Sequence, residues 1–289
     1  MQTVANLDTN KRHYDSSYGG VDVAAMVEKV RHVDRFLDDA TVTDASWVLL
    51  YHGDFRARLR GARVLELGAG TGLNALVMAA LGAHVLATDI SEETPRLVRT
   101  AAAQLGLASR IDAVAGDFVT MGLPAGAFDF VVGKAFLHHL THEVEDAYLR
   151  ETARVLRPTG EARFMEPAVN SRLLDALRWL VPVPGRPSRL HASAWAAYKA
   201  ADPHPERDNS SRHYREAGLR YFDHVETVTR GGIDRLHRFL PKGELDRAFR
   251  RFAYRAERVL PHAVRHVIAR GQVVILRHPR ADAGLGSVA

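Results

Sequence analysis

The sequence has 289 residues, of which 46% are hydrophobic and 25% charged, a balance that excludes a disordered chain and suits one large α/β domain with or without a cap. It contains no cysteine, so disulfides, thiolate metal ligands and a cysteine nucleophile are excluded. It has no apolar run of about 18 residues and no signal-peptide pattern, so we expect a cytoplasmic protein without a membrane partner. The net charge of +5 comes mainly from arginines interleaved with acidic residues, which predicts a solvated basic surface and no nucleic-acid partner.

The first 60 residues predict a lid made of helices. Residues 1 to about 20 are polar and rich in turn-forming residues, and apolar residues then recur at helical spacing up to about Arg60. Asp44 or Ser46 is expected to cap the second of these helices. We expect this segment, residues 1–60, to close one side of a ligand site.

From Gly61 onward, short apolar runs alternate with helical segments. Strands are expected over 64–67, 85–88, 111–115, 128–132 and 162–165, and helices over 73–81, 94–105 and 143–156, the last of them stopped by Arg157-Pro158-Thr159-Gly160. This alternation predicts an α/β fold with a doubly wound, mostly parallel sheet. Strand signals at 220–228 and 272–277 complete a seven-stranded, Rossmann-like sheet.

The rhythm breaks after Pro167, and this break predicts the division of the chain. Residues 61–167 are expected to form the ligand-binding core, and residues 168–218, which begin with a helix over 171–180, a helical cap insert after strand five. Residues 219–289 are expected to complete the core with strands and helices.

A glycine-rich turn joins the first strand to the first core helix. It reads Glu66-Leu67-Gly68-Ala69-Gly70-Thr71-Gly72, and such a turn lets a ligand approach the backbone and the N-terminus of the next helix. The dinucleotide-binding pattern would need glycine at position 73, where this chain has leucine. The turn therefore favours a ligand that lacks a pyrophosphate.

Acidic residues follow the next two strands. Asp89 ends the second strand, where a carboxylate accepts hydrogen bonds from both hydroxyls of a ribose; a helix cap is the alternative role. Asp117 and Phe118 follow the third strand, where a carboxylate beside an aromatic ring suits an adenine base; an ordinary loop aspartate is the alternative. Because the carboxyl ends of parallel strands meet at one edge of a sheet, we expect one nucleoside site there.

These motifs resemble those of the class I S-adenosylmethionine (SAM)-dependent methyltransferase family over residues 61–167. The resemblance implies SAM as the cofactor and S-adenosylhomocysteine (SAH) as its product. It extends to the fourth strand, Phe128–Ala135, where Lys134 would line the cofactor through its backbone, and to Tyr14-Asp15, whose tyrosine would reach the methionine end of SAM. The implied cofactor-binding residues are Tyr14, Glu66, Gly68, Ala69, Gly70, Asp89, Ile90, Asp117, Phe118 and Lys134.

Three histidines after the fourth strand, His138, His139 and His142, lie where the methyl group should be. His139, and after it His138, is the candidate catalytic base for a hydroxyl acceptor, because histidine is the usual base at neutral pH. Alternatively His138 or His139 contacts the methionine moiety of the cofactor, both rings are structural, or His138 and His142, four residues apart, bind a metal on a helix face. No carboxylate pair lies nearby to support a metal-dependent site, so we assign no metal.

The cap insert is expected to hold the methyl acceptor. Its aromatic and histidine side chains suit a small organic ligand, and an ordinary helical cap is the alternative. The candidate substrate-binding residues are His191, Trp195, Tyr198 and His213.

A cap of this size resembles the small-molecule, secondary-metabolite branch of the family. The Asn/Asp-Pro-Pro-aromatic motif of nucleic-acid and protein amide methyltransferases is missing after the fourth strand, where Gly133-Lys134-Ala135-Phe136 stands. We therefore expect a small-molecule acceptor methylated at oxygen. Methylation at nitrogen or carbon, or non-methyl chemistry such as cyclisation, is the alternative, and the chain is expected to be a monomer or homodimer.

Overall fold

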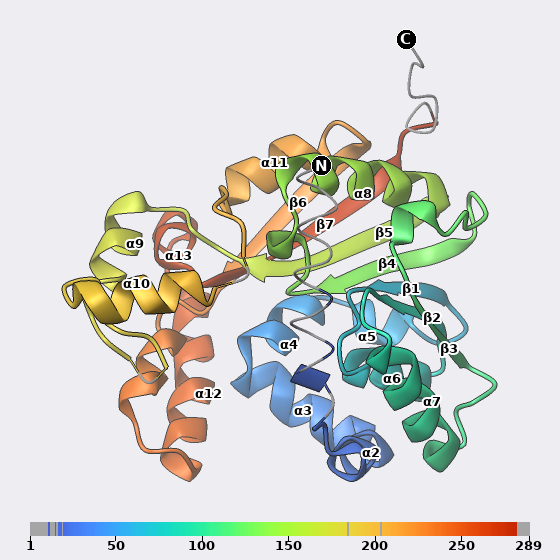
Figure 1. The fold of residues 1–289 in the computed structure, drawn as a ribbon, viewed down its shortest axis with the longest axis horizontal. Coiled ribbons are helices and arrows are strands. Elements are labelled where there is room, and N and C mark those ends of the chain that lie inside the picture. The colour runs from blue at the N-terminus through green and yellow to red at the C-terminus, as the bar shows by residue number, and fades with distance from the viewer. Residues whose placement is uncertain are drawn as a thin grey trace.

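A computed structural model of the chain describes residues 11, 15, 17, 18, 20–183, 185–202 and 204–281. Its centre is one sheet of seven strands in the order β3-β2-β1-β4-β5-β7-β6 (Figure 1). The strands are β1 (Arg63–Leu67), β2 (His84–Asp89), β3 (Ile111–Ala115), β4 (Phe128–Lys134), β5 (Leu156–Pro167), β6 (Phe222–Arg230) and β7 (Gly271–Pro279). The first five run parallel to one another, and β7 runs antiparallel to β5 and β6. The predicted doubly wound, mostly parallel, seven-stranded fold is confirmed.

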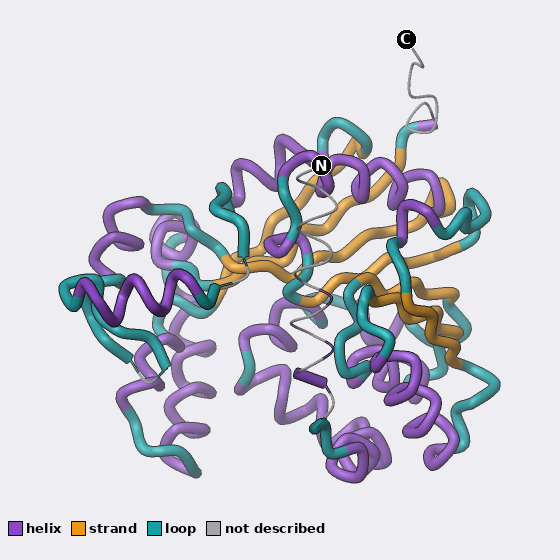
Figure 2. Tube along the Cα trace, in the orientation of Figure 1, coloured by secondary structure: helices purple, strands orange, loops and turns teal. Residues whose placement is uncertain are grey.

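Helices cover both faces of the sheet, and Figure 2 shows the strands as a layer between them. From residue 20 onward, the helices that precede the sheet are α2 (Val23–Arg31), α3 (Val33–Thr43), α4 (Ala45–Leu50) and α5 (Phe55–Arg58). The helices between strands are α6 (Leu73–Ala80), α7 (Glu93–Leu105), the 3₁₀ turns η1 (Phe118–Thr120) and η2 (Leu137–His139), and α8 (His142–Val155). Those that follow β5 are α9 (Arg172–Arg178), α10 (Ala192–Ala200), α11 (Ser211–Gly218), η3 (Asp234–Phe239), α12 (Glu244–Val259) and α13 (His262–Ile268).

The two faces of the sheet carry two separate cores because successive residues of a strand point to opposite sides. In β1, Val64 packs with the N-terminal helices, α6 and α7, whereas its neighbour Leu65 packs with α8 and α11. The same alternation occurs in β7, where Ile275 joins the first core and Val274 the second. Strands buried on both faces in this way read as uninterrupted apolar runs, which is why the sequence revealed them.

The fifth strand differs from the expectation in where it begins. It starts at Leu156, directly after α8, and includes the Arg157–Gly160 stretch that was expected to be a loop. Leu156 pairs with Phe128, and the register then shifts before the next pair, Phe130 with Glu161. The irregular pairing admits a proline and a glycine that a regular strand interior disfavours, so composition alone concealed the strand.

The segment after β5 has two parts. Helices α9 and α10 stand beyond the strand ends, next to α12 and α13, at the left of Figure 1. Helix α11 instead packs on the sheet, where Tyr214 and Ala217 join the core beneath α8. The division at residues 60, 167 and 218 stays a prediction. No helix in the described ranges is long and apolar enough to cross a membrane.

Candidate functional site

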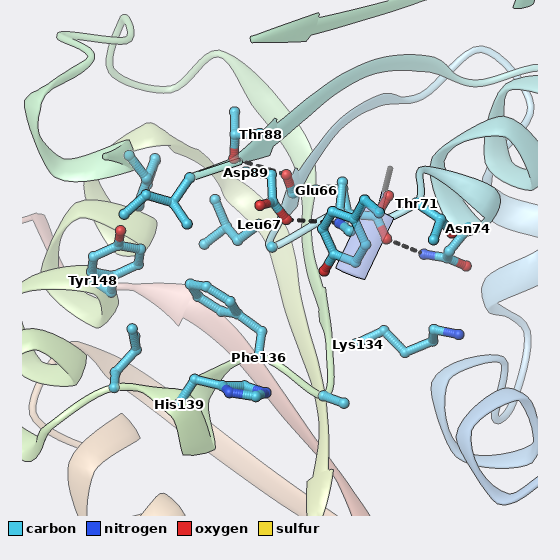
Figure 3. Close-up of a pocket in the computed structure, with 18 of the residues that line it drawn as sticks. Glu66, Leu67, Thr71, Asn74, Thr88, Asp89, Lys134, Phe136, His139 and Tyr148 are labelled. Carbon is cyan, nitrogen blue, oxygen red and sulfur yellow. Dashed lines mark hydrogen bonds between the residues drawn. The ribbon is translucent and has the colours of Figure 1, made fainter. Parts of the chain in front are cut away.

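A cavity of about 280 Å³ lies at the carboxyl ends of β1, β2 and β4 (Figure 3). Its wall includes the residues that end these strands, Leu67, Asp89 and Lys134. The strand order reverses between β1 and β4, where α6 and α7 cover one face of the sheet and α8 the other, and ligands of doubly wound sheets bind at such a switch point. The cavity therefore occupies the place that the sequence motifs predicted.

The glycine turn forms one wall of the cavity. Gly68 and Gly70 have φ angles of 62° and 58°, the left-handed region that favours glycine. A Cβ atom on Gly68 would lie 2.3 Å from Cδ2 of Phe136, and one on Gly70 would lie 3.1 Å from the hydroxyl of Tyr18. Side chains at these positions would fill the space that a ligand needs, so the turn fits a molecule held against its backbone.

Glu66 is a buried carboxyl group of the cavity wall. One oxygen accepts a hydrogen bond of 2.7 Å from Nδ2 of Asn74, whose own oxygen accepts 2.9 Å from the hydroxyl of Tyr51. The other oxygen, Oε2, has no hydrogen-bond partner among the described residues. Burial raises the pKa of Glu66 to about 7. An unpaired carboxylate oxygen in such a wall suits a positively charged ligand group.

Asp89 ends β2, and both of its carboxylate oxygens bind backbone amides. Oδ2 accepts from the amide of Gly70 at 2.7 Å, and Oδ1 from that of Ser91 at 2.9 Å. Burial raises the pKa of Asp89, whereas these amide hydrogen bonds lower it. The alternative role as a helix cap is not realised, because Glu92 is the N-cap residue of α7. Asp89 remains in the cavity wall with Ile90, as a ribose ligand would.

The adenine side is built from aromatic rings. Phe118 lines the cavity, and its ring centre lies 5.5 Å from that of Tyr148 on α8. Asp117 does not line this cavity: its Oδ1 accepts 2.7 Å from the hydroxyl of Tyr148 and 3.3 Å from the amide of Val119, so it caps η1 and fixes the ring. The cofactor role expected of Asp117 stays a prediction.

Lys134 lines the cavity, but its side chain extends away from the cavity residues in Figure 3. Its ammonium group lies 4.5 Å from the centre of the Trp47 ring, and burial lowers the pKa of Lys134. The next residue, Ala135, has a φ of 58°, a conformation that is strained for a residue with a Cβ atom. This arrangement is compatible with the backbone role implied for Lys134.

Several cavity residues were not identified from the sequence. Apart from Thr71, which belongs to the glycine turn, they carry no shared local motif: Tyr18, Thr71, Asn74, Thr88, Phe136, Leu140 and Tyr148. Tyr14, the tyrosine expected at the methionine end of SAM, lies outside the described residues. Its neighbour Asp15 accepts 2.6 Å from the hydroxyl of Ser91, which ties the N-terminal segment to the end of β2.

The two candidate bases occupy different environments. His139 lines the cavity, whereas Nδ1 of His138 lies 2.7 Å from Oε2 of Glu166. Glu166 is fully buried and also accepts the amides of Phe136, Leu137 and His138 at 2.7 to 3.2 Å. It thereby fixes the backbone of η2 and with it the position of His139.

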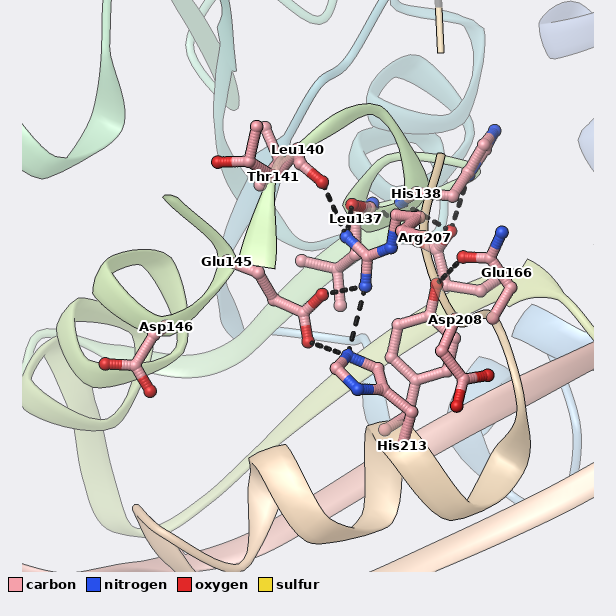
Figure 4. A network of polar contacts seen from close by, with 12 residues as sticks. Leu137, His138, Leu140, Thr141, Glu145, Asp146, Glu166, Arg207, Asp208 and His213 are labelled. Carbon is pink, nitrogen blue, oxygen red and sulfur yellow. Dashed lines mark hydrogen bonds and ion pairs between the residues drawn. The ribbon is translucent and has the colours of Figure 1, made fainter. Parts of the chain in front are cut away.

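Behind η2 lies the polar network shown in Figure 4. Arg207 pairs with the buried Glu145 and donates hydrogen bonds of 2.7 Å to the carbonyls of Leu137 and Leu140. Nε2 of His213 lies 3.0 Å from Glu145, so this candidate substrate residue belongs to the network and does not line the cavity. The network ties the end of the cap insert to the loop that carries the candidate bases.

The other candidate substrate residues lie in the cap. Trp195 stacks on Tyr198 with ring centres 5.7 Å apart, and both rings face Trp179. Tyr198 lines a second cavity of about 720 Å³, and His191 is an exposed residue at the start of α10. Their role in acceptor binding stays a prediction.

Comparison with known proteins agrees with this site. Residues 64–160, which contain the glycine turn, Asp89 and His139, match a family model described as a methyltransferase domain. The matched segment is therefore a methyltransferase domain, and its motifs are those of the class I SAM-dependent type. The predicted resemblance and the predicted cofactor, SAM, are thereby confirmed.

Curated relatives of this chain match it over part of their length. The ubiquinone biosynthesis O-methyltransferase of Caulobacter vibrioides is 36% identical over 126 residues, which are 43% of this chain and 47% of the relative. The demethylmenaquinone methyltransferase of Clavibacter sepedonicus is 29% identical over 189 residues, which are 63% of this chain and 74% of that protein. The chain thus spans about half the length of the Caulobacter relative.

Solved structures share the fold of this chain at low sequence identity. The [4+2]-cyclase SpnF superposes with a TM-score of 0.50 at 21% identity, covering 85% of this chain and 81% of its own. The phosphoethanolamine N-methyltransferase 2 of Haemonchus contortus superposes with a TM-score of 0.51 at 13% identity, covering 90% of this chain and 61% of its own. At these identities the likeness concerns the fold alone.

Proposed function

We propose that the chain transfers the methyl group of SAM to a small organic acceptor, and that the methylated atom is oxygen. The observation that carries the proposal is the position of His139, which lines the same cavity as Glu66 and Asp89. An imidazole at the edge of a cofactor cavity suits an acceptor hydroxyl, because such a group becomes a better nucleophile as it loses its proton.

The cavity residues divide the binding of SAM among them. Oε2 of Glu66 is placed to accept from the positively charged amino group, and Asp89 to accept from the ribose hydroxyls. Phe118 and Tyr148 offer rings on which the adenine packs. When bound, SAM supplies a methyl group on a positively charged sulfur, which is already strongly activated for displacement.

The chain itself positions the acceptor, excludes water from it and supplies a group that accepts its proton. Phe136 and Leu140 give the His139 side of the cavity an apolar wall that excludes water from the acceptor. Glu166 holds η2 through three backbone amides, so His139 keeps a fixed direction toward the cavity. In this role His139 takes the hydroxyl proton as the acceptor oxygen forms its bond to carbon.

The comparisons support a small-molecule acceptor. The two curated relatives are a ubiquinone biosynthesis O-methyltransferase and a demethylmenaquinone methyltransferase by name, and the first name also supports oxygen. Methylation at nitrogen or carbon is the alternative. Non-methyl chemistry is a further alternative, since one protein with this fold is a [4+2]-cyclase.

The test is a turnover assay with SAM that carries a ¹³C-labelled methyl group. The purified chain is incubated with a metabolite extract or a panel of phenols, and the chemical shift of the transferred carbon identifies the atom that received it. An O-methyl signal that disappears in His139→Ala and persists in His224→Ala, an exposed histidine on β6 that serves as the control, supports the proposal. An N- or C-methyl signal contradicts the oxygen assignment, and no transferred label at all contradicts methyl transfer.

A further inference from the structure

Three histidines form a cluster at the edge of the cofactor cavity. His138 and His139 are neighbours in η2, and His204 reaches them from the loop between α10 and α11. Each offers one ring nitrogen, and the three nitrogens lie within 4.8 Å of one another. The ring centres are 4.2 Å apart for His138 and His139, 4.3 Å for His139 and His204, and 5.1 Å for His138 and His204. In the described part of the chain this is the one such group of three.

Carboxylates orient two of the three rings. Nδ1 of His138 lies 2.7 Å from Glu166, and Nδ1 of His204 lies 2.5 Å from Asp202. A carboxylate accepts a hydrogen bond, so in each neutral ring Nδ1 carries the proton and Nε2 keeps its lone pair. Histidine ligands of metals make this same contact through their second nitrogen, and it both fixes the ring and strengthens the ligand.

We propose that His138, His139 and His204 bind one divalent transition-metal ion, and that zinc fits the site best. Imidazole nitrogen is a preferred ligand of zinc, at a distance of about 2.0–2.1 Å. Two nitrogens on a tetrahedral zinc ion are then roughly 3.4 Å apart. Small rotations of the side chains close the present separations of at most 4.8 Å. Glu166 and Asp202 balance the charge of the ion.

The other histidine pair near η2 lacks these features. His142 stacks on His213 with ring centres 4.4 Å apart, and His213 lies beside the Glu145–Arg207 ion pair. Arg207 already neutralises Glu145, and no third ligand completes a set there within the described residues. His138 lies in η2 and His142 in α8, so they do not share the helix face considered from the sequence, and it is His204 that joins His138 and His139.

Three protein ligands leave a coordination position open, which is typical of catalytic rather than structural zinc. Because His139 also lines the cofactor cavity, an ion bound here borders the place of the acceptor. A metal-bound hydroxyl loses its proton near neutral pH, so the ion would take over the deprotonation assigned above to His139. This catalytic role rests on the proposed function, whereas metal binding itself does not.

The test is metal titration of the full chain after treatment with a chelator. Zinc sulfate is added in a calorimeter and cobalt(II) chloride in a spectrophotometer. We expect one ion per chain and the visible absorption of tetrahedral, nitrogen-ligated cobalt. His204→Ala should weaken zinc binding by more than roughly 100-fold and Asp202→Asn by roughly 10- to 100-fold. His191→Ala, an exposed histidine at the start of α10, should bind as the wild type does.

Two results overturn the proposal: saturable binding of neither ion to the wild-type chain, or unchanged binding to His204→Ala. Thermal melting without metal checks that the variants fold, and the rise in Tm with zinc should vanish in His204→Ala alone of the two alanine variants. SAH titration of the metal-free chain is read separately. If the metal-free chain does not bind SAH, the cofactor site is contradicted. If it binds SAH but the chain does not bind zinc, only the metal site is contradicted.

A different observation supports a second site, in the 720 Å³ cavity between the cap and η3. Five arginines line this cavity: Arg178, Arg186, Arg235, Arg238 and Arg270. Arg178 pairs with Asp175 at 2.8 Å, whereas Arg186, Arg235 and Arg238 have no ion-pair partner among the described residues. Burial, and after it repulsion among the arginines, lowers the pKa values of Arg235 and Arg238.

The structure assigns this cavity to an organic phosphate with an apolar group. Guanidinium groups bind phosphate in a bidentate manner, and a doubly charged anion relieves the repulsion among them. The same wall carries exposed apolar side chains, Leu177, Val181 and Phe239, next to the ring of Trp179. A purely inorganic anion would leave these side chains in contact with water.

Octyl phosphate is the probe, and its binding is measured by calorimetry and by the change in fluorescence of Trp179. We expect it to bind at least 10-fold more tightly than inorganic phosphate, and octanol to bind weakly or not at all. The double variant Arg235→Gln, Arg238→Gln should lose this binding, and Arg212→Gln, on the exposed surface of α11, should keep it. Equal binding of octyl phosphate and octanol, or an unchanged double variant, overturns the assignment.

Discussion

Replacement of Glu66 by glutamine should stabilise the cofactor-free protein and weaken its cofactor binding at the same time. The carboxyl group is 1% exposed, Asn74 donates to one of its oxygens, and the other has no partner in the described structure. Glutamine keeps an oxygen for Asn74 but carries no charge. The substitution therefore measures both how much a buried carboxylate destabilises the fold and how much it strengthens SAM binding.

The pH dependence follows from the raised pKa of Glu66, which moves from 4.5 to about 7 on folding. The folded state holds its proton where the unfolded state has lost it, so this group's contribution to stability is full below pH 4.5 and is lost as the pH rises through 7. A change of about one pKa unit corresponds to roughly 1.4 kcal/mol. As the pH rises from 5 to 8, the unfolding free energy of Glu66→Gln should thus increase by roughly 2–3 kcal/mol relative to that of the wild type.

The assay is urea denaturation at pH 5, 6, 7 and 8, followed by tryptophan fluorescence without ligand. Glu28→Gln, on the exposed surface of α2, is the matched control and should run parallel to the wild type. SAM affinity at pH 8, measured by calorimetry, should fall by roughly 10- to 100-fold in Glu66→Gln, as for loss of a hydrogen bond to a charged group. If the stability difference does not change with pH, the carboxyl group is not held protonated and the reasoning fails.

Three further substitutions test the walls of the site. Gly68→Ala places a Cβ atom 2.3 Å from a ring carbon of Phe136, at a φ of 62°. The unfolding free energy should therefore fall by about 1–3 kcal/mol, and SAM should bind at least 10-fold more weakly in a titration. An affinity equal to that of the wild type would contradict the placement of SAM against the glycine turn. Tyr148→Phe removes the hydroxyl that donates to Asp117, which should cost about 1 kcal/mol in urea denaturation and should shift the near-ultraviolet dichroism; an unchanged free energy would mean that this contact is replaced by water. Arg207→Met removes the arginine partner of the buried Glu145 and leaves it only His213. Denaturation should therefore report a loss of about 3–5 kcal/mol in unfolding free energy, and a loss below about 1 kcal/mol would contradict a desolvated pair.

The fold and the cofactor site were predictable because their signals are local. Each buried parallel strand is a short apolar run, and Asp89 stands at the end of such a run. The carboxyl ends of the strands meet at the switch point of the sheet, and this arrangement does not depend on the conformation of the loops. Glu66, the glycine turn, Asp89 and Phe118 all line the cavity as expected.

The remainder of the site depends on contacts between distant segments. His204 lies beside His139 only because the loop after α10 returns to η2, and Arg207 donates to the carbonyl of Leu137 from 70 positions away. His213 was expected to face the acceptor, but the buried Glu145 draws it into the network behind η2. Nothing in the local sequence pattern distinguishes these partners from ordinary surface residues, because their environment is set by tertiary packing.

The cofactor cavity is tested most directly by SAH titration of the wild-type chain and of Gly70→Arg in a calorimeter. The wild type should bind one SAH per chain. Gly70→Arg should keep the circular dichroism of the fold and bind none, because the new side chain would occupy the space beside the turn, where a Cβ atom alone already comes within 3.1 Å of Tyr18. Unchanged SAH affinity in Gly70→Arg, or no binding by the wild type, would contradict the placement of SAM at this edge of the sheet.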